Sequence, residues 1–410
     1  MYKAMYHTFD HLRLSDKQTQ EANIAFLHDF NAVLESPHLK KLAKKTQLIP
    51  NSEHCHNRLF HTIDVCHVSG LIVEHLNNYF QENNISPVNK DLVKAISLAH
   101  DIGHPPFGHT GERALDEMMK KMGGFESNAQ SIKILVTSSD NFKFRTITAL
   151  MKYKTNIPLI REEYNGLIKG YYGYMTDYLE PLFLTYQENV IEQSIVDIAD
   201  TFSYSLSDLK DLILFYGENR FAQLLNKYFT EGAMLEEAML FFPEISRSEL
   251  LYFIPKIMED IKNNILGEIL QNYCKFTSDP LQSIIHDFID SLVIKINYAQ
   301  PMYSKLNLPI ENELKLFLLN QITKKCFLER SVNREIDKKI THNIQLTYDY
   351  LFNLNSEDSL LKLDKEILQK LINMSSHTER ARFVCDVICH LSDMEIVDFV
   401  SKSSKKIIVV

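Results

Sequence analysis

The most informative stretch of this chain is His100-Asp101-Ile102-Gly103-His104-Pro105-Pro106-Phe107-Gly108-His109-Thr110-Gly111-Glu112. It contains three histidines and two carboxylates, and it directly follows the apolar run of residues 95–99. Imidazole and carboxylate groups hold catalytic divalent metals, and they also act as general acids and bases. The stretch therefore indicates metal-assisted hydrolysis at the end of an apolar helix.

The composition is typical of a soluble, helical protein. Of the 410 residues, 45% are hydrophobic and 24% are charged, and only 12 glycines and 12 prolines are present. Few helix breakers predict long helices and little sheet. The net charge of −9 argues against a broad nucleic-acid-binding surface, so an anionic substrate would need a local basic pocket.

The spacing of apolar residues predicts an all-α fold. Residues 158–178, rich in glycine and tyrosine, are expected to form a loop or a short irregular insertion, and 217–400 to alternate helices with short breaks. We find no internal repeat and no convincing β alternation. Helices are expected over 21–36, 58–82, 90–101, 108–122, 126–137, 143–153 and 186–215.

The cysteines and the hydropathy indicate a cytoplasmic protein with reduced thiols. The six cysteines are scattered without a Cys-x-x-Cys pair: Cys55, Cys66, Cys274, Cys326, Cys385 and Cys389. No signal-peptide pattern is evident, and no apolar run reaches the length of about 18 residues that a membrane span needs. Cys385 and Cys389 are interpreted as buried apolar residues of one helix face rather than as a metal-binding pair.

Two further clusters of polar residues accompany the opening stretch. Arg58 and His61 are three residues apart at the head of a predicted helix, so they share one face. In the helix predicted over 186–215, polar side chains recur at spacings of three, four and four and form one stripe. This stripe consists of Asp197, Asp200, Tyr204 and Asp208.

These segments together resemble one family, the HD-domain phosphohydrolases, and more narrowly their bacterial dGTPase and dNTP triphosphohydrolase branch. The resemblance is good over about residues 30–215 and weak over 376–400, and it does not anchor 216–375. The matching segments are residues 44–47, 57–61, 100–112, 126–131, 150–153 and 198–208, with 386–393 as a weaker match.

The resemblance implies an HD-domain helical bundle with an extended C-terminal helical region. Residues 1–215 would form the metallophosphohydrolase core. Residues 216–410 would pack on that core and complete the base or regulatory sites. Homo-oligomers, as tetramers or hexamers, are also implied, and an allosteric nucleotide site or a single-stranded DNA contact is left open. No membrane partner is expected.

The resemblance also implies the roles of individual residues. One divalent ion, Mn²⁺, Mg²⁺, Fe²⁺, Ni²⁺ or Zn²⁺, would be held by His61, His100, Asp101 and Asp200. His109 with Glu112 would form an acid/base dyad, and His104 is a third candidate that could reach the phosphates. The substrate-binding set would be Arg58, Lys152 and Tyr204 for phosphate, and Gln47 and Asp208 for the sugar.

The implied reaction is hydrolysis of dNTPs, with dGTP among them, to deoxynucleoside and inorganic tripolyphosphate. One departure bears on it, because Ser127 stands where the family usually has a histidine. Two alternatives therefore stay open. The first is an HD phosphatase acting on nucleoside monophosphates or other phosphoesters, and the second is a weakly catalytic, nucleotide-sensing oligomer.

Several residues also have simpler interpretations. Asp197 can be a helix-surface carboxylate and Tyr204 a core tyrosine. His54 and His56 are expected in a loop that flanks the site. A solvated surface is the simpler interpretation for the basic residues Lys40, Lys41, Lys44, Lys45, Arg380 and Arg382.

Overall fold

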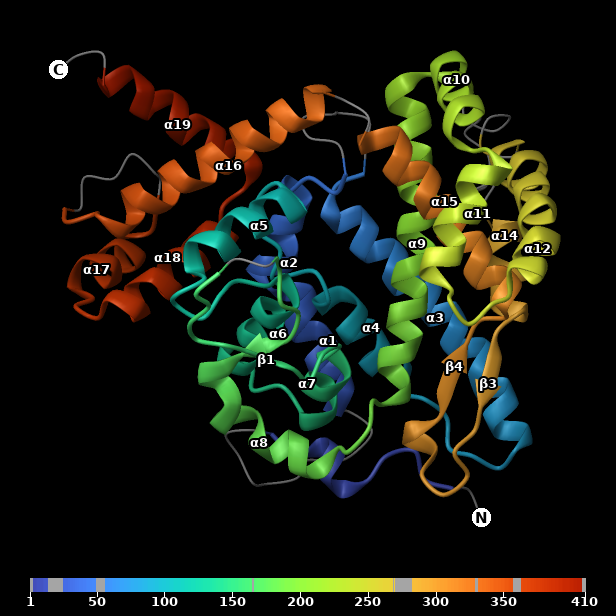
Figure 1. The fold of residues 1–410 in the computed structure, drawn as a ribbon. Helices are drawn as coiled ribbons and strands as arrows, with labels where there is room; N and C mark the ends of the chain where they lie inside the picture. Colours follow the sequence, from blue (N-terminus) through green and yellow to red (C-terminus); the bar gives the residue numbers. More distant parts are fainter. Residues whose placement is uncertain are drawn as a thin grey trace.

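The computed structural model describes residues 3–13, 25–48, 56–163, 166–267, 269, 282–328, 331–356 and 363–407. His54, Cys55 and Cys274 lie outside these residues, so the expectations for them are untested. The all-α prediction is confirmed, since the described part of the chain is dominated by helices (Figure 1). Its strands form two small sheets, in which β1 (Asn156–Ile157) pairs in parallel with β2 (Tyr171–Tyr172) and β3 (Val293–Lys295) antiparallel with β4 (Lys305–Asn307).

The N-terminal helices follow the predicted ones closely. The helix predicted over 58–82 has these same ends, and Asn57 caps it by accepting a hydrogen bond from the Phe60 amide. Pro37 does not simply end the first helix. It is the first residue of a second one, a position where its missing amide hydrogen costs nothing. The elements are η1 (Thr8–His11), α1 (Ala25–Glu35), α2 (Pro37–Lys41), η2 (Leu42–Lys44), α3 (Arg58–Glu82), α4 (Lys90–Ala99), α5 (Gly108–Met119), α6 (Ser127–Thr137) and α7 (Phe144–Leu150).

The central part differs from the prediction in two places. The stretch 158–178, predicted to be irregular, contains β2, the 3₁₀ helix η3 (Gly173–Met175) and the start of α8 (Thr176–Thr185). The helix predicted from 186 begins at Ile191 and is α9 (Ile191–Tyr216). The sequence lacked a strong apolar period at α8, whose interior contains Pro181.

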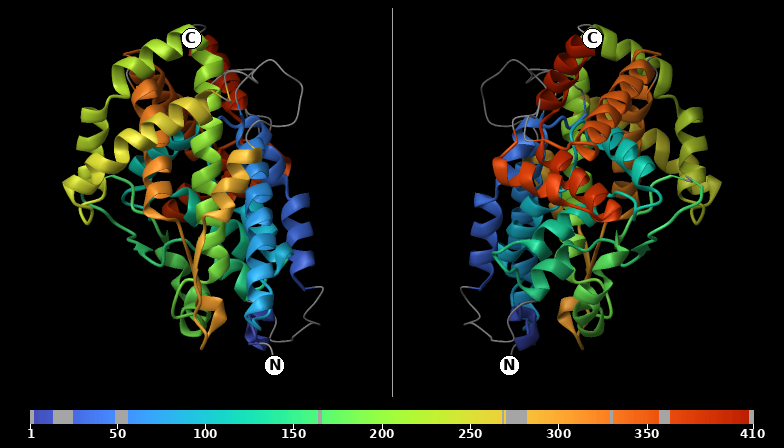
Figure 2. Two further views of the ribbon diagram at one scale, coloured as in Figure 1. Left: turned by 90° about the vertical axis from the view of Figure 1, so that its right-hand side faces the viewer. Right: turned by 90° about the vertical axis from the view of Figure 1, so that its left-hand side faces the viewer.

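The remaining elements flank α9 and α5. Figure 1 places α10, α11, α12, α14 and α15 on one side of α9 and α16–α19 on the other, beside α5. These elements are α10 (Glu218–Tyr228), α11 (Glu231–Phe241), α12 (Arg247–Asp260) with the π-helix η4 (Ile261–Leu266), α14 (Gln282–Asp290), η5 (Pro301–Tyr303), α15 (Ile310–Leu328), α16 (Ser331–Phe352), α17 (Lys365–Asn373), α18 (His377–His390) and α19 (Asp393–Ile407). The views at right angles in Figure 2 show η1 and α19 at opposite ends of the molecule.

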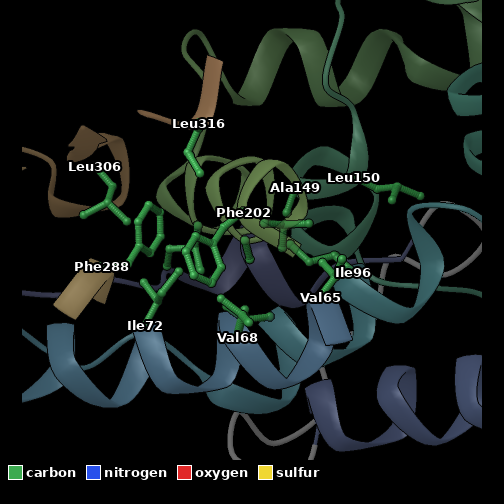
Figure 3. Packing of buried hydrophobic residues seen from close by; sticks show 14 of the residues in the cluster. Val65, Val68, Ile72, Ile96, Ala149, Leu150, Phe202, Phe288, Leu306 and Leu316 are labelled. Atoms are coloured by element: carbon green, nitrogen blue, oxygen red, sulfur yellow. The ribbon is translucent and has the colours of Figure 1, made fainter. Parts of the chain in front are cut away.

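The hydrophobic core forms two clusters. The larger one joins α3, α4 and α9 to α14 and α15, and Figure 3 shows Phe202 of α9 stacked on Phe288 of α14. Their ring centroids lie 4.0 Å apart. The smaller cluster joins α5 to α16, α18 and α19 and contains Cys385 and Cys389, which are buried as predicted. Burial of one face of α9 leaves its opposite, polar face to line a pocket.

The larger core contains residues from both sides of position 215. The division into a core of 1–215 and a C-terminal region of 216–410 therefore stays a prediction. None of the described helices combines the length and the apolar character that crossing a bilayer requires.

Candidate active site

The opening stretch forms the end of one helix, a tight turn and the start of the next helix. His100 is the C-terminal cap of α4, and α5 begins at Gly108. Gly103 is required by close packing, because a Cβ atom there would lie 2.3 Å from the Ser127 carbonyl oxygen. This turn brings the histidines of both helices to one pocket.

The four predicted metal ligands lie close together among the residues that line this pocket. Nε2 of His61 lies 3.1 Å from Oδ1 of Asp200 and 4.0 Å from Oδ2 of Asp101. Nε2 of His100 lies 3.5 Å from Oδ1 of Asp101 and 3.7 Å from Oδ1 of Asp200. These residues come from α3, the α4–α5 turn and α9, so three separate segments contribute.

The chemistry of these donors fits a divalent ion. Nδ1 of His100 lies 2.6 Å from the Ser97 carbonyl oxygen, an interaction that places the proton on Nδ1 and leaves Nε2 as a ligand atom. This Nε2 is buried and has no hydrogen-bond partner in the protein. Burial raises the pKa of Asp101, but the charges of His104, His100 and Arg58 outweigh burial and hold that pKa well below its usual range. An ionised carboxylate and unprotonated imidazole nitrogens are what a metal requires.

His109 and Glu112 lie together in the first turns of α5. Nδ1 of His109 is 3.0 Å from Oε2 of Glu112, and the other carboxylate oxygen accepts a hydrogen bond of 2.7 Å from the Ser127 amide. Burial raises the pKa of Glu112, but the hydrogen bond from His109 and the charge of His104 lower it to about 2. The buried carboxylate therefore orients a histidine whose side chain is 70% exposed.

His104 lies between the metal ligands and this dyad. Its Nδ1 is 3.0 Å from Oδ1 of Asp101, and its ring meets the His109 ring edge-on with centroids 5.6 Å apart. Burial and the Arg58 charge lower the pKa of His104 to about 4. His104 is thus neutral at pH 7 and touches both parts of the site.

The two predicted phosphate-binding cations are already paired with carboxylates. An Nη atom of Arg58 donates to Oδ2 of Asp101 at 2.8 Å, and Nζ of Lys152 lies 2.8 Å from Oδ1 of Asp197. Asp197 lines the pocket with a side chain that is 37% exposed, so it is a carboxylate on the pocket-facing surface of α9. Each of these two positive charges is therefore already balanced by a carboxylate of the protein.

The predicted sugar-binding residues line the same pocket, which has a volume of about 580 Å³. Burial raises the pKa of Asp208 to about 7. The side-chain amide oxygen of Gln47 is buried without a hydrogen-bond partner in the protein. The Tyr204 hydroxyl accepts a hydrogen bond of 3.2 Å from Asn320 of α15, so Tyr204 is a partly buried pocket residue and not only a core tyrosine.

Sequence reasoning missed several residues of this site. The pocket is also lined by Arg113, Asn128, Tyr153, Leu167 and Lys169. Asn128 lies within one of the segments that resemble the family, but no role was predicted for it. Arg113 was predictable, because it follows His109 by four residues and so shares its face of the helix. Lys169 and Asn320 carry no local signal, because only the fold brings them to the site.

Three basic residues are less exposed than predicted. Lys45 is 2% exposed, and its ammonium group donates to two backbone carbonyl groups. Arg382 is 8% exposed and stacks on the Tyr172 ring with 4.1 Å between the guanidinium carbon and the centroid. Arg380 is half-buried and donates to the Leu371 and Phe352 carbonyl oxygens. The surface interpretation is therefore wrong for Lys45 and Arg382, which are buried, while Arg380 is partly exposed and bonded to backbone carbonyl groups.

Comparison with known proteins places this site in a family. The HD domain family model matches residues 58–205, the segment that carries all four predicted metal ligands. A deoxyguanosinetriphosphate triphosphohydrolase-like protein of Rickettsia bellii is 30% identical over 379 residues, covering 90% of this chain and 88% of that protein. The deoxyguanosinetriphosphate triphosphohydrolase-like protein 2 of Mesorhizobium japonicum is 25% identical, covering 91% of both chains. The chain therefore belongs to the HD-domain family of deoxyguanosinetriphosphate triphosphohydrolase-like proteins.

Proposed function

We propose that this protein is a metal-dependent hydrolase that splits dNTPs, dGTP among them, into deoxynucleoside and inorganic tripolyphosphate. The observation that carries the proposal is the convergence of His61, His100, Asp101 and Asp200 beside the His109–Glu112 dyad in one pocket. The relatives' names point to the same substrate class.

The divalent ion would be held by the four converging side chains. It would supply Lewis acidity at the α-phosphorus and orient the attacking water. Two imidazoles with two carboxylates accept Mn²⁺, Mg²⁺, Fe²⁺, Ni²⁺ or Zn²⁺.

The His109–Glu112 dyad would carry out the proton transfers. In the proposed reaction a water oxygen bonds to the α-phosphorus and gives up a proton, the bond from that phosphorus to the nucleoside oxygen breaks, and the nucleoside oxygen takes up a proton. His109 is oriented through Nδ1 by Glu112 and exposes its other nitrogen, so it can hold or deliver that proton. Neutral His104 lies beside it as a second imidazole.

The remaining pocket residues suit a deoxynucleoside triphosphate. Arg58, Lys152 and Lys169 supply positive charge to the phosphates, and Tyr204 supplies a hydroxyl. At the sugar, Gln47 offers an unpaired side-chain amide oxygen and Asp208 offers a carboxyl oxygen. Both can accept a hydrogen bond from a sugar hydroxyl. A site that pairs with a sugar hydroxyl rejects analogues that lack it.

The deciding experiment is phosphorus NMR of the products formed from dGTP and Mn²⁺. We expect tripolyphosphate alone, and release of pyrophosphate or single phosphate would overturn the reaction. A panel of nucleoside monophosphates distinguishes the phosphatase alternative. Absence of turnover with any dNTP and any of the five metals would favour the nucleotide-sensing oligomer. We also propose a homo-oligomer, which light scattering after size exclusion tests, and a cytoplasmic location stays a prediction.

A further inference from the structure

The junction between α18 and α19 contacts the active-site turn although it lies almost 300 residues away in the chain. Asp393 is the first residue of α19 and is 7% exposed. Its Oδ1 accepts a hydrogen bond of 2.8 Å from the Phe107 amide, and its Oδ2 accepts one of 2.9 Å from the Thr46 amide and another from the Thr46 hydroxyl. One buried carboxylate thus joins two segments that are remote from it in sequence.

Both segments carry residues of the candidate site. Phe107 is the N-terminal cap of α5 and has a φ of +61°, a conformation that a bulky side chain rarely adopts. His109 follows it by two residues and Glu112 by five. Thr46 precedes Gln47. The Asp393 carboxylate therefore fixes the start of the helix that carries the dyad and the segment that carries the proposed sugar contact.

Lys45 makes a second connection at the same place. Its ammonium group donates to the His104 and Cys389 carbonyl oxygens at 2.6 Å each, and its own carbonyl oxygen accepts from the Arg58 amide at 3.1 Å. Segment 45–46 is therefore bonded to the start of α3, to the active-site turn and to the end of α18.

Apolar contacts also hold α18 and α19 in place. The two helices are anchored by buried apolar residues that pack with α5 and α16, among them Val384, Ile388, Ile396 and Phe399. Asp393 stands in the chain between Leu391 and Ile396 of this cluster and is itself a buried carboxylate. Its three hydrogen bonds are all directed at the active-site segments, which separates its role from that of the cluster.

We propose that Asp393 is a positioning residue of the active site, which holds the start of α5 and the Gln47 segment in the geometry that hydrolysis requires. The kinetic part of this inference rests on the proposed function. The structural part, the attachment of residues 46 and 107 to α19, does not.

The test compares Asp393→Asn with the matched control Asp398→Asn on the exposed side of the same helix. An amide offers one acceptor oxygen, so it cannot satisfy both backbone donors, and its NH₂ group would face one of them. We expect kcat for dGTP to fall about 10- to 100-fold through misplacement of the dyad. We also expect faster hydrogen–deuterium exchange in peptides covering 42–48 and 103–112, while α16 and α18 exchange as before. Asp398→Asn should match the wild type in both measurements.

Unchanged exchange and unchanged kcat in Asp393→Asn would overturn the proposal. So would a uniform rise in exchange through α16–α19, because that would show a merely structural role. A second variant, Thr46→Val, removes only the hydrogen bond from the Thr46 hydroxyl and keeps the test possible if Asp393→Asn does not fold. We expect it to lower kcat by less than Asp393→Asn. If both variants fold, their effects on kcat should be non-additive in the double variant. A wild-type protein inactive on all dNTPs would refute the proposed function, while the exchange data would still decide the attachment.

Discussion

Nδ1 of His109 lies 3.0 Å from a carboxylate oxygen of Glu112, and the carboxylate is buried while most of the imidazole is exposed. This arrangement fixes one nitrogen of the ring and presents the other to the pocket. The buried carboxylate orients the exposed imidazole, and this arrangement agrees with proton transfer at the pocket surface.

Glu112→Gln should therefore lower kcat for dGTP by about 10²- to 10⁴-fold, because the amide would stabilise neither the correct tautomer nor the imidazolium. Metal content should stay at the wild-type level, since Glu112 is outside the ligand cluster. Steady-state kinetics together with metal analysis checks this. His75→Ala, a partly exposed change on α3, serves as the control. Wild-type kcat in Glu112→Gln would remove the dyad from the mechanism.

Removal of the metal should abolish hydrolysis. Asp200→Asn weakens the ligand set by a charge and should lose bound metal, since its carboxylate approaches both histidine nitrogens within 3.7 Å. We expect that a chelator inactivates the wild type and that Mn²⁺ restores it, whereas Asp200→Asn is not restored at equal Mn²⁺. Calorimetric titration with Mn²⁺ gives the loss of affinity independently of activity. Full turnover by chelated, metal-free protein would contradict the assignment.

Lys169→Ala should raise KM for dGTP by roughly 3- to 30-fold and leave kcat nearly unchanged, because a rim cation contributes similarly to ground-state and transition-state binding. Increasing salt should reduce the difference between variant and wild type, since an exposed charge is screened. Lys121→Ala, an exposed change outside the pocket, is the matched control. A fall in kcat without a change in KM would assign Lys169 a different role.

His56 should make stability depend on pH. Nδ1 of His56 lies 2.7 Å from Oδ1 of Asp211, a fully buried carboxylate, and this hydrogen bond raises the pKa of His56 although burial opposes it. A raised folded-state pKa means that the pair stabilises the fold fully below the ordinary value of 6.5. That contribution is lost as the pH rises through the raised pKa.

Asp211→Asn should thus lower the free energy of unfolding by about 1.5–3 kcal/mol at pH 5.5 and by less at pH 8.5. Denaturant unfolding of both proteins across this pH range measures the difference. An equal deficit at both pH values would show that protonation of His56 does not contribute.

Much of the fold was predictable because helices follow from local periodicity, whereas the metal-ligand set was implied by a family resemblance and stays a prediction. The ends of α3 follow from Asn57 and the apolar spacing, and the stripe of Asp197, Asp200, Tyr204 and Asp208 follows from the helical repeat alone. The start of α8 was missed because Pro181 and its tyrosine-rich surroundings are typical of loops.

What could not be predicted are the contacts between remote segments. Lys45 belongs to a lysine-rich stretch that is typical of a solvated helix face, and its burial depends on carbonyl groups of residues 104 and 389. Asn320 and Asp393 reach Tyr204 and the 46 and 107 segments only because the packing of α15 and α19 brings them there. No spacing rule within a single helix reveals such partners.

The stacking of Phe202 on Phe288 bears on the rotation of α9 about its own axis. Successive residues of a helix point about 100° apart, so Phe202 faces the core while its neighbours at positions 200 and 204 face the pocket. A turn of α9 about its own axis would move Asp200 out of the cluster and Tyr204 off Asn320 at the same time. The ring pair lies on the side of α9 away from the pocket, together with other buried apolar residues of this helix such as Leu206 and Leu209, so packing on the core side sets how Asp200 and Tyr204 face the pocket.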